Sequence, residues 1–495
     1  MLAVYWLYFR GAIVNPHIIE VAPGASQKLA RAWLWMGIMA LIGSGLLAIL
    51  LVLSRTPGIQ DIFPLKNFFR AALVVHVDLS VAIWFMAFAA VIWSALGRGG
   101  LAWLGWAGLA LAALGTALMT VSPFLPGAEP VLNNYIPVLQ QPYFHVALWI
   151  CGAGFSLAVL RALLTTWPRP VFGAPLQTGA FLGAVAAFLA LAAFLWSFLV
   201  VPRAPEIEDK LYFEVLFWGG GHTLQFQHAL LMVVAWLWIA AALGWAEASP
   251  PGRPKAGQAT DMEPHGGEPS SPSPVGRGAG GGLSTAPRAL SAMFWIAALP
   301  LLAVPLIYLT IPAGELPHMQ LFAKLMIWGH PYMAPLILAG LLSLWSIRRA
   351  PPGGAKSAFI ASFALFAVGG VLGYMIQGVN VVIPAHYHGS TVGVTLAFMG
   401  LAYVLLPRLG YGEVDGAMAR WQPYVYGGGQ LIHILGLAWS GGYGVQRKVA
   451  GAEQALTTLP QKIGMGMMGA GGLIAVIGGI MFVLVCLKIM LRKRN

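Results

Sequence analysis

Ala385-His386-Tyr387-His388-Gly389 begins an apolar stretch that continues as STVGVTLAFMGLAYVLLP, residues 390–407. Such a stretch is long enough to cross a bilayer as a helix. Two histidines two residues apart on a helix point about 200° away from each other, because one turn takes 3.6 residues. One helix can therefore present an imidazole on each of two sides. Interfacial histidines satisfied by water or backbone are the alternative, but further histidines at the same depth favour a metal site.

The composition is that of a polytopic membrane protein. Hydrophobic residues make up 59% and charged residues 9% of the 495 residues, which is more apolar than a soluble domain. The net charge of +12 comes mainly from Lys and Arg in short loops on one side, so nucleic acid is not an expected partner. Cys151 and Cys486 lie in apolar segments, and no C-x-x-C-H motif for covalent haem attachment occurs. The first residues lack a cationic leader and cleavage site, so we expect no cleaved signal.

Apolar runs of spanning length predict an all-α membrane protein with twelve helices. The predicted spans are 31–53, 70–97, 101–121, 142–166, 176–201, 213–246, 289–311, 318–347, 357–381, 384–407, 421–441 and 463–488. The excess of Lys and Arg in alternate loops places both termini in the cytoplasm.

Residues 247–288 interrupt this pattern. Pro, Gly and Ser dominate the segment, which predicts a flexible cytoplasmic linker. It separates predicted membrane helices 1 to 6, within residues 1–246, from helices 7 to 12, within residues 289–495. We expect one integral-membrane domain overall.

Several histidines share one depth near the outer ends of predicted helices. Ionisable or metal-binding side chains are costly in a bilayer and are usually functional there. These residues are His76, His222, His318, His386 and His388. Three others, which we interpret as interfacial or hydrogen-bonded structural residues, are His145, His330 and His433.

Twelve helices with these histidines resemble subunit I of the haem–copper oxidase superfamily, which includes the nitric oxide reductases, over nearly the whole chain. The resemblance is to an atypical branch. It implies two haems, one low-spin and one high-spin, and one non-haem metal, copper or iron. It further implies that His76 and His388 ligate the low-spin haem and that His386 ligates the high-spin haem.

The resemblance also implies ligands for the non-haem metal. The stretch FWGGGHTLQFQH is similar to the family's helix 6 ligand segment, which assigns this role to His222. The family's adjacent His-His pair before helix 8 corresponds to His318-Met319 here, so its second histidine is replaced. The third ligand stays open. The candidates, in order, are Met319, then Glu315, His228 and His330.

Other residues are candidates for supporting roles in this resemblance. The sequence GVQRK resembles a loop near haem propionates, which implies Arg447 and Lys448, although a solvated charge pair is the alternative. Second-shell or proton-transfer candidates are Gln225, Tyr308 and Glu315.

Two features favour nitric oxide over dioxygen as the substrate. Many dioxygen-reducing members carry a tyrosine four residues after the helix 6 histidine, where this chain has Phe226. The inner halves of the predicted helices hold no Asp, Glu or Lys before Lys488, which favours protons drawn from outside. Nitric oxide reduction joins two nitric oxide molecules, two electrons and two protons into nitrous oxide and water. The helix 6 glutamate usual in nitric oxide reductases is missing.

Two alternatives remain open. Within the same superfamily, the chain would be a terminal oxidase that reduces dioxygen to water with cytochrome c or quinol as donor. From a different class, it would be a polytopic transporter whose outer histidines bind substrate or metal. For either gas, nitric oxide or dioxygen, we expect a respiratory electron donor, which is a partner subunit, cytochrome c or quinol. We expect the protein in the inner (plasma) membrane of a prokaryote, in contact with lipid.

Deletion of residues 250–285 should leave haem content and gas turnover near those of the full chain. Changing the length of a flexible loop alters the folding free energy by only about 0.6 kcal/mol per doubling. Haem quantified on the purified deletion variant measures the effect. A loss of haem would show that the segment is more than a linker.

Overall fold

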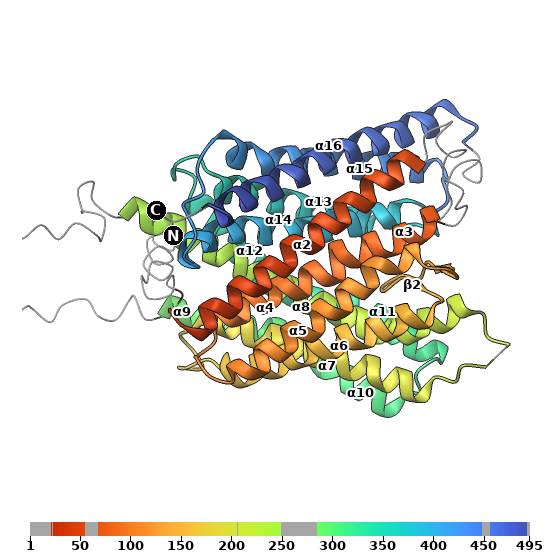
Figure 1. Cartoon of the computed structure of the whole chain (residues 1–495), viewed down its shortest axis with the longest axis horizontal. Coiled ribbons are helices and arrows are strands. Elements are labelled where there is room, and N and C mark those ends of the chain that lie inside the picture. Colours follow the sequence, from red (N-terminus) through yellow and green to blue (C-terminus); the bar gives the residue numbers. More distant parts are fainter. Residues whose placement is uncertain are drawn as a thin grey trace, which may run out of the picture.

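The computed structural model describes residues 21, 23–54, 68–204, 206–248, 285–447 and 456–492. Helices dominate these residues and lie side by side along the long axis of the molecule (Figure 1). Eleven helices in this part of the chain are long and apolar enough to cross a membrane. The prediction of an all-α, multi-pass membrane protein is thereby confirmed.

Most predicted spans are single helices. These are α2 (Ala25–Ser54), α5 (Ala102–Val121), α6 (Pro142–Thr165), α7 (Pro175–Val200), α8 (Asp209–Ala248), α13 (Gly354–Tyr374), α14 (Val382–Arg408), α15 (Ala417–Gly442) and α16 (Leu459–Met490). α15 is the predicted span that is absent from the eleven apolar helices. Its Gln422, Gln430 and His433 lower the hydropathy of a helix that packs mainly on other helices.

Three predicted spans are interrupted. Span 2 consists of α3 (Phe68–Val77), the π-helical turn η2 (Asp78–Ile83) and α4 (Trp84–Leu96). Span 7 consists of α9 (Thr285–Ala298), the 3₁₀ turn η4 (Leu299–Leu302) and α10 (Ala303–Thr310). Span 8 consists of α11 (Leu316–Gly329), the 3₁₀ turn η5 (His330–Met333) and α12 (Ala334–Ser346). Pro300 and Pro331 are the second residues of the two 3₁₀ turns. Proline cannot donate the backbone hydrogen bond of an α-helix, so the α-helix is interrupted at each of them.

A small hairpin connects α5 to α6 at one end of the bundle. After the 3₁₀ turn η3 (Ser122–Phe124), strand β1 (Pro130–Val131) pairs antiparallel with β2 (Val138–Leu139). The predicted linker lies for the most part outside the described residues, since α8 ends at Ala248 and α9 begins at Thr285.

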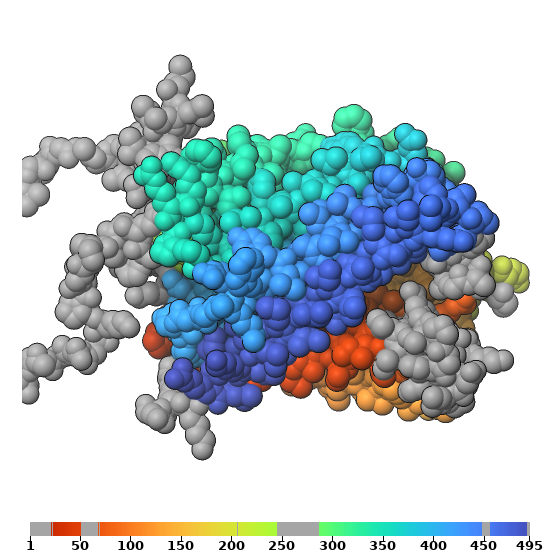
Figure 2. Space-filling view, turned by 90° about the horizontal axis from the view of Figure 1, so that it is seen from above, coloured from red at the N-terminus to blue at the C-terminus, as the bar shows by residue number. Residues whose placement is uncertain are grey.

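The two helices that carry most of the candidate histidines are the innermost ones. In the most apolar windows of α8 and α14, 83% and 89% of the residues are buried, compared with 33% in α5 and α16. α16 packs on α15 and crosses the face beside α2 (Figure 2). α8 and α14 therefore form the centre of the bundle, and the other helices enclose them.

Glycines seven residues apart allow α15 and α16 to touch backbone to backbone. A Cβ at Gly429 would lie 2.5 Å from the Ala475 nitrogen, and one at Gly436 would lie 2.5 Å from the Gly464 carbonyl oxygen. A Cβ at Gly471 would lie 2.4 Å from the nitrogen of His433. Small residues at such seams let membrane helices approach closely, since lipid offers no hydrophobic drive for their association.

Gly471→Ala should destabilise the protein by about 1–3 kcal/mol, because the added methyl group forces the α15 backbone away. Gly469→Ala is the matched control, since a Cβ there meets nothing within 4 Å. The control should change stability by less than about 1 kcal/mol. Thermal unfolding in detergent would measure both. Equal melting temperatures for the two variants would contradict the backbone contact.

Candidate functional site

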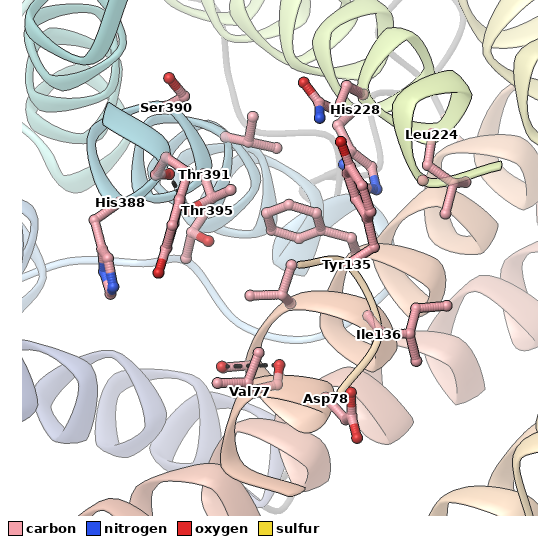
Figure 3. A pocket seen from close by; sticks show the side chains of 18 of the residues that line it. Val77, Asp78, Tyr135, Ile136, Leu224, His228, His388, Ser390, Thr391 and Thr395 are labelled. Carbon is pink, nitrogen blue, oxygen red and sulfur yellow. Dashed lines mark hydrogen bonds between the residues drawn. The ribbon is translucent and has the colours of Figure 1, made fainter. Parts of the chain in front are cut away.

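A cavity of about 3290 Å³ lies between α14, α8 and their neighbours. It is several times larger than ordinary small-ligand pockets of about 300–1,000 Å³, so it has room for more than one large ligand. Figure 3 shows His388 on one side of it and Tyr135 and His228 on the other. The histidines that line it are His76, His145, His228, His330, His386, His388 and His433.

His386 on α14 is fixed by the neighbouring helix α13. Its Nδ1 lies 2.7 Å from the carbonyl oxygen of Gly369, which can only accept, so Nδ1 carries the hydrogen. A Cβ at Gly373 would lie 2.8 Å from the same Nδ1, so glycine at this position makes room for the ring. The arrangement leaves Nε2 unprotonated, and a backbone-held imidazole of this kind is the usual metal ligand.

His76 is fixed in the same way by α2. Its Nδ1 lies 2.9 Å from the Ser44 carbonyl oxygen and 3.0 Å from the Ser44 hydroxyl. The helix changes to the π-helical turn η2 directly after His76 and Val77, at Asp78. Single π turns inside α-helices are frequent at functional sites. His76 therefore also presents a free Nε2 from an oriented ring.

His388 lies near two other histidines. Its ring centroid is 5.0 Å from that of His433 on α15, and it is close enough to His76 for the two to interact electrostatically. His433 donates from Nδ1 to the Met468 carbonyl oxygen at 2.8 Å. The structure thus brings His76 and His388 to one region of the cavity, and it adds His433, for which the sequence indicated only a structural role.

These donors fit haem. Two imidazoles with protonated, backbone-held Nδ1 atoms and a third imidazole on α14 face one large cavity whose walls are mostly apolar. Haem needs such axial nitrogen ligands and a flat apolar slot. His76 and His388 would hold one haem, and His386 would hold the other from the opposite side of α14.

His222 lies on α8 in a different environment. It is buried, and its Nδ1 lies 2.6 Å from the Trp218 carbonyl oxygen. The hydroxyl of Tyr135, from the hairpin, lies 2.9 Å from His222 Nε2 and 2.9 Å from Nδ1. An oxygen equally far from both ring nitrogens does not lie along the lone pair of Nε2, so the phenol contacts the imidazole without occupying that nitrogen.

Three further candidate ligands, His318, Met319 and Glu315, do not line the cavity, whereas the lower-ranked candidates His228 and His330 do. His318 is buried, with Nδ1 3.2 Å from the Ile311 carbonyl oxygen and its ring centroid 4.7 Å from that of Tyr308. The phenyl ring of Phe322 contacts both His318 and His222, at centroid separations of 5.1 and 6.1 Å. Met319 is partly buried and Glu315 is exposed at the start of α11.

The side chains present do not fit a three-ligand non-haem metal site. Across the described residues, no three His, Cys, Asp or Glu side chains converge to hold a metal ion. His330, a lower-ranked candidate, does line the cavity, but its ring stacks on Phe226 at 4.7 Å. The rings of the predicted pair, His222 and His318, both pack on Phe322.

The hairpin that carries Tyr135 is hydrogen-bonded to the N-terminal part of α8. The backbone nitrogen of Asn134 donates to Glu214 at 3.1 Å, and its side-chain amide donates to the same carboxylate. Arg447, a predicted propionate ligand that lines the cavity, donates to the Asn134 side-chain oxygen at 3.2 Å. Its predicted partner Lys448 lies outside the described residues. Asn134 therefore connects Arg447 to Glu214 on α8 through hydrogen bonds.

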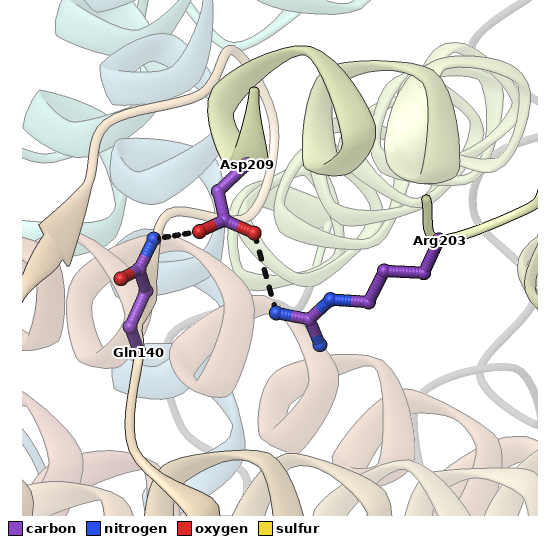
Figure 4. Close-up of polar contacts among 3 residues, drawn as sticks. All are labelled: Gln140, Arg203 and Asp209. Carbon is purple, nitrogen blue, oxygen red and sulfur yellow. Dashed lines mark hydrogen bonds and ion pairs between the residues drawn. The ribbon is translucent and has the colours of Figure 1, made fainter. Parts of the chain in front are cut away.

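A second clamp joins the end of the hairpin to the start of α8. Arg203 and Asp209 form an ion pair of 3.2 Å, and Gln140 donates to the same carboxylate (Figure 4). The ion pair is exposed and adds little stability by itself. Asp209 and Glu214 together hold the turn and the C-terminal side of the hairpin at the start of α8.

The remaining residues predicted to support the site or to transfer protons lie in different places. Gln225 lines the cavity. The Tyr308 hydroxyl lies 2.9 Å from the Ser197 hydroxyl, and Tyr308 does not line the cavity. The position of Tyr135 beside His222 could not be predicted from the sequence. Tyr135 occurs in a short loop without periodicity, 87 positions from His222. The only local signal is the polar Asn133-Asn134 pair before it, which is typical of turns.

Tyr135 should make the folding free energy depend on alkaline pH. Burial and, to a lesser extent, the negative charge of Glu214 raise the pKa of its phenol above the ordinary value of 10.0. A raised folded pKa means stability that is complete below about pH 10 and falls as the unfolded phenol ionises, by at most about 1.4 kcal/mol per pH unit.

Denaturant unfolding between neutral and alkaline pH would measure this dependence. Tyr135→Phe should flatten the alkaline fall. Tyr143→Phe, at an exposed tyrosine, should keep it. Identical slopes in both variants would contradict the buried position of the Tyr135 phenol beside Glu214.

Comparison with known proteins gives the fold but no family assignment by sequence. No protein-family model matches the chain. An uncharacterized protein of Rickettsia prowazekii (strain Madrid E) is 29% identical over 533 residues, which cover 94% of this chain and 96% of that protein. An uncharacterized protein of Aquifex aeolicus (strain VF5) is 26% identical over 398 residues, which cover 79% of this chain and 88% of that protein.

A solved structure is similar over almost the whole chain. The cryo-EM structure of a haem–copper terminal oxidase dimer matches with a TM-score of 0.62 and 16% sequence identity, covering 96% of this chain and 85% of that chain. The chain therefore has the fold of a haem–copper terminal oxidase.

Proposed function

We propose that this chain is the catalytic subunit of a respiratory membrane oxidoreductase that reduces a diatomic gas, with nitric oxide as the favoured substrate. The observation that carries the proposal is the large cavity that His76, His386 and His388 all line. Two histidines two residues apart on α14 point about 200° away from each other. Bound haem would supply one-electron redox chemistry and, at an open axial position, gas binding.

The three histidines would have different tasks. His76 and His388 together would saturate one haem, which leaves that group able only to pass electrons. His386 alone would hold the second haem, which would supply gas binding. The backbone bonds from Gly369 and Ser44 hold the imidazoles in orientation, so no ring rotation is needed on binding.

The preference for nitric oxide rests on proton supply and on the residue at position 226. Two nitric oxide molecules need two protons and two electrons, whereas dioxygen needs four of each. Phe226, at the usual tyrosine position, is fully buried and stacks on His330. The carboxylates nearest the cavity's outer mouth, such as Glu214, suit protons drawn from outside.

Dioxygen reduction to water is the second candidate, and one observation favours it. The Tyr135 hydroxyl lies 2.9 Å from His222, so a phenol is available beside α8 although position 226 lacks one. In either case the electron donor is a partner subunit, cytochrome c or quinol. Arg447 would pair with a haem propionate. We place the protein in a prokaryotic plasma membrane, with both termini cytoplasmic.

Single substitutions of the three ligands would test the proposal. His76→Ala and His388→Ala should each abolish the low-spin bis-imidazole spectrum, since each removes one of the two axial nitrogens. His386→Ala should remove only the high-spin haem. His145→Ala is the control, because His145 lines the cavity without a proposed ligand role and should leave both haems in place.

Optical and electron paramagnetic resonance spectra of the purified variants provide the measurement. A full low-spin spectrum in both His76→Ala and His388→Ala would overturn the ligand assignment. Nitric oxide and dioxygen consumption on one preparation would then decide the substrate. A wild-type protein without haem bands would instead support the transporter alternative.

A further inference from the structure

We infer that His433 on α15 is a positioning residue for His388, and that it sets the orientation and the basicity of this imidazole as an axial ligand of the haem shared with His76. The inference deepens the proposed function and rests on it for the presence of that haem. The sequence alone indicates only a structural role for His433. The assignment follows from the packing of the two rings, the tautomer of His433 and the surroundings of His388.

The imidazole rings of His388 and His433 are in contact. Their centroids lie 5.0 Å apart, and the planes of the rings meet at 51°. Both residues line the large cavity. At this separation, a rotation about the side-chain bonds of His388 brings a nitrogen of one ring within hydrogen-bonding distance of a nitrogen of the other. His433 therefore borders the ring of His388 on the side of α15.

Glycine holds the helices on both sides of this contact close together. Gly389 directly follows His388 on α14. A Cβ at Gly389 would lie 2.6 Å from Cα of Gly369 on α13 and 3.3 Å from Cδ1 of Ile434 on α15. Ile434 is the residue after His433. Small residues let membrane helices approach in this way, so the ring contact depends on a closely packed seam between three helices.

On its other side, His433 is fixed by α16. A Cβ at Gly471 would lie 2.4 Å from the backbone nitrogen of His433, and one at Gly472 would lie 3.4 Å from its Nδ1. Because both positions are glycine, Nδ1 comes within 2.8 Å of the Met468 carbonyl oxygen. A carbonyl oxygen can only accept, so Nδ1 carries the hydrogen and Nε2 keeps a lone pair. His433 is therefore an oriented hydrogen-bond acceptor.

His388 differs from the other two proposed ligands in its surroundings. His76 and His386 each bond through Nδ1 to a backbone carbonyl oxygen of a neighbouring helix. The ring of His388 makes no hydrogen bond to any residue that the structure describes. When one of its nitrogens binds iron, the other carries a hydrogen that needs an acceptor in this apolar interior. Nε2 of His433 offers a lone pair for it, from a ring already in contact.

This hydrogen bond would tune the haem. An acceptor on the nitrogen that does not bind iron makes an axial imidazole more basic. A more basic ligand donates more charge to the iron and favours its oxidised state, so the midpoint potential of the haem falls. His433 would therefore lower the potential of the haem held by His76 and His388. The role also accounts for a polar side chain on a membrane-spanning helix, where such residues are costly.

Redox titration of the purified protein, followed by the optical bands of the low-spin haem, tests the inference. His433→Phe and His433→Leu both remove the acceptor, so the midpoint potential should rise while the bis-imidazole spectrum remains. Either variant suffices if the other fails to fold. His433→Gln keeps an acceptor and should return the potential toward the wild-type value. An equal rise in all three variants would assign the effect to packing and overturn the hydrogen bond.

Tyr426→Phe is the matched control. Tyr426 lies seven residues, about two turns, before His433 on the same face of α15. It also lines the cavity, and it packs on α16, where a Cβ at Gly478 would lie 2.4 Å from its backbone nitrogen. The substitution removes a polar atom from the same seam at a distance from His388, so the midpoint potential should stay at the wild-type value. An equal shift in this control would overturn the specific role of His433.

The remaining outcomes separate the inference from the proposed function. An unchanged midpoint potential in His433→Phe and His433→Leu would overturn the inference and leave the proposed function intact. Loss of the low-spin spectrum in these variants, with haem still bound, would also overturn it, because His433 would then be an axial ligand itself. A wild-type preparation without haem would overturn the proposed function and, with it, the inference.

Discussion

A polar side chain buried among apolar helices is costly unless a protein group satisfies it, and this constraint orders the histidines of the site. Four imidazoles meet it by donating from Nδ1 to a backbone carbonyl oxygen, which belongs to Ser44, Gly369, Met468 or Trp218. Each carbonyl lies in a helix, so the acceptor is rigid. The bond sets the tautomer and turns the opposite nitrogen in a defined direction.

The same bond has different consequences in α14 and in α8. On α14, Nε2 of His386 faces the cavity, so a ligand can bind there. On α8, the Tyr135 hydroxyl lies 2.9 Å from both ring nitrogens of His222, so a group from the hairpin packs against this imidazole. The surroundings of each histidine thus depend on groups from distant parts of the chain.

The fold could be predicted well from the sequence, and the site only in part. Apolar runs identify the spans because helices in lipid must be long and apolar, and the shared depth of the outer histidines follows from those spans. The position of His318 outside the cavity lining could not be predicted, because it depends on how α11 packs on α8 and α10. The glycine run 219–221 is visible in the sequence, but the rings that occupy it come from other elements. His433 shows the same limit, since its closeness to His388 arises from the packing of α15 on α14.

The double clamp of the hairpin imposes an order on biogenesis. Residues 132–137 line the outer part of the cavity, and they are tied to α8 through Glu214 and Asp209. These ties restrict the movement of the hairpin, so a prosthetic group that entered past residues 132–137 would need them to open. Insertion along that path would precede the closing of the hairpin on α8. The same two carboxylates that position the hairpin would then also set the order of the last steps of maturation.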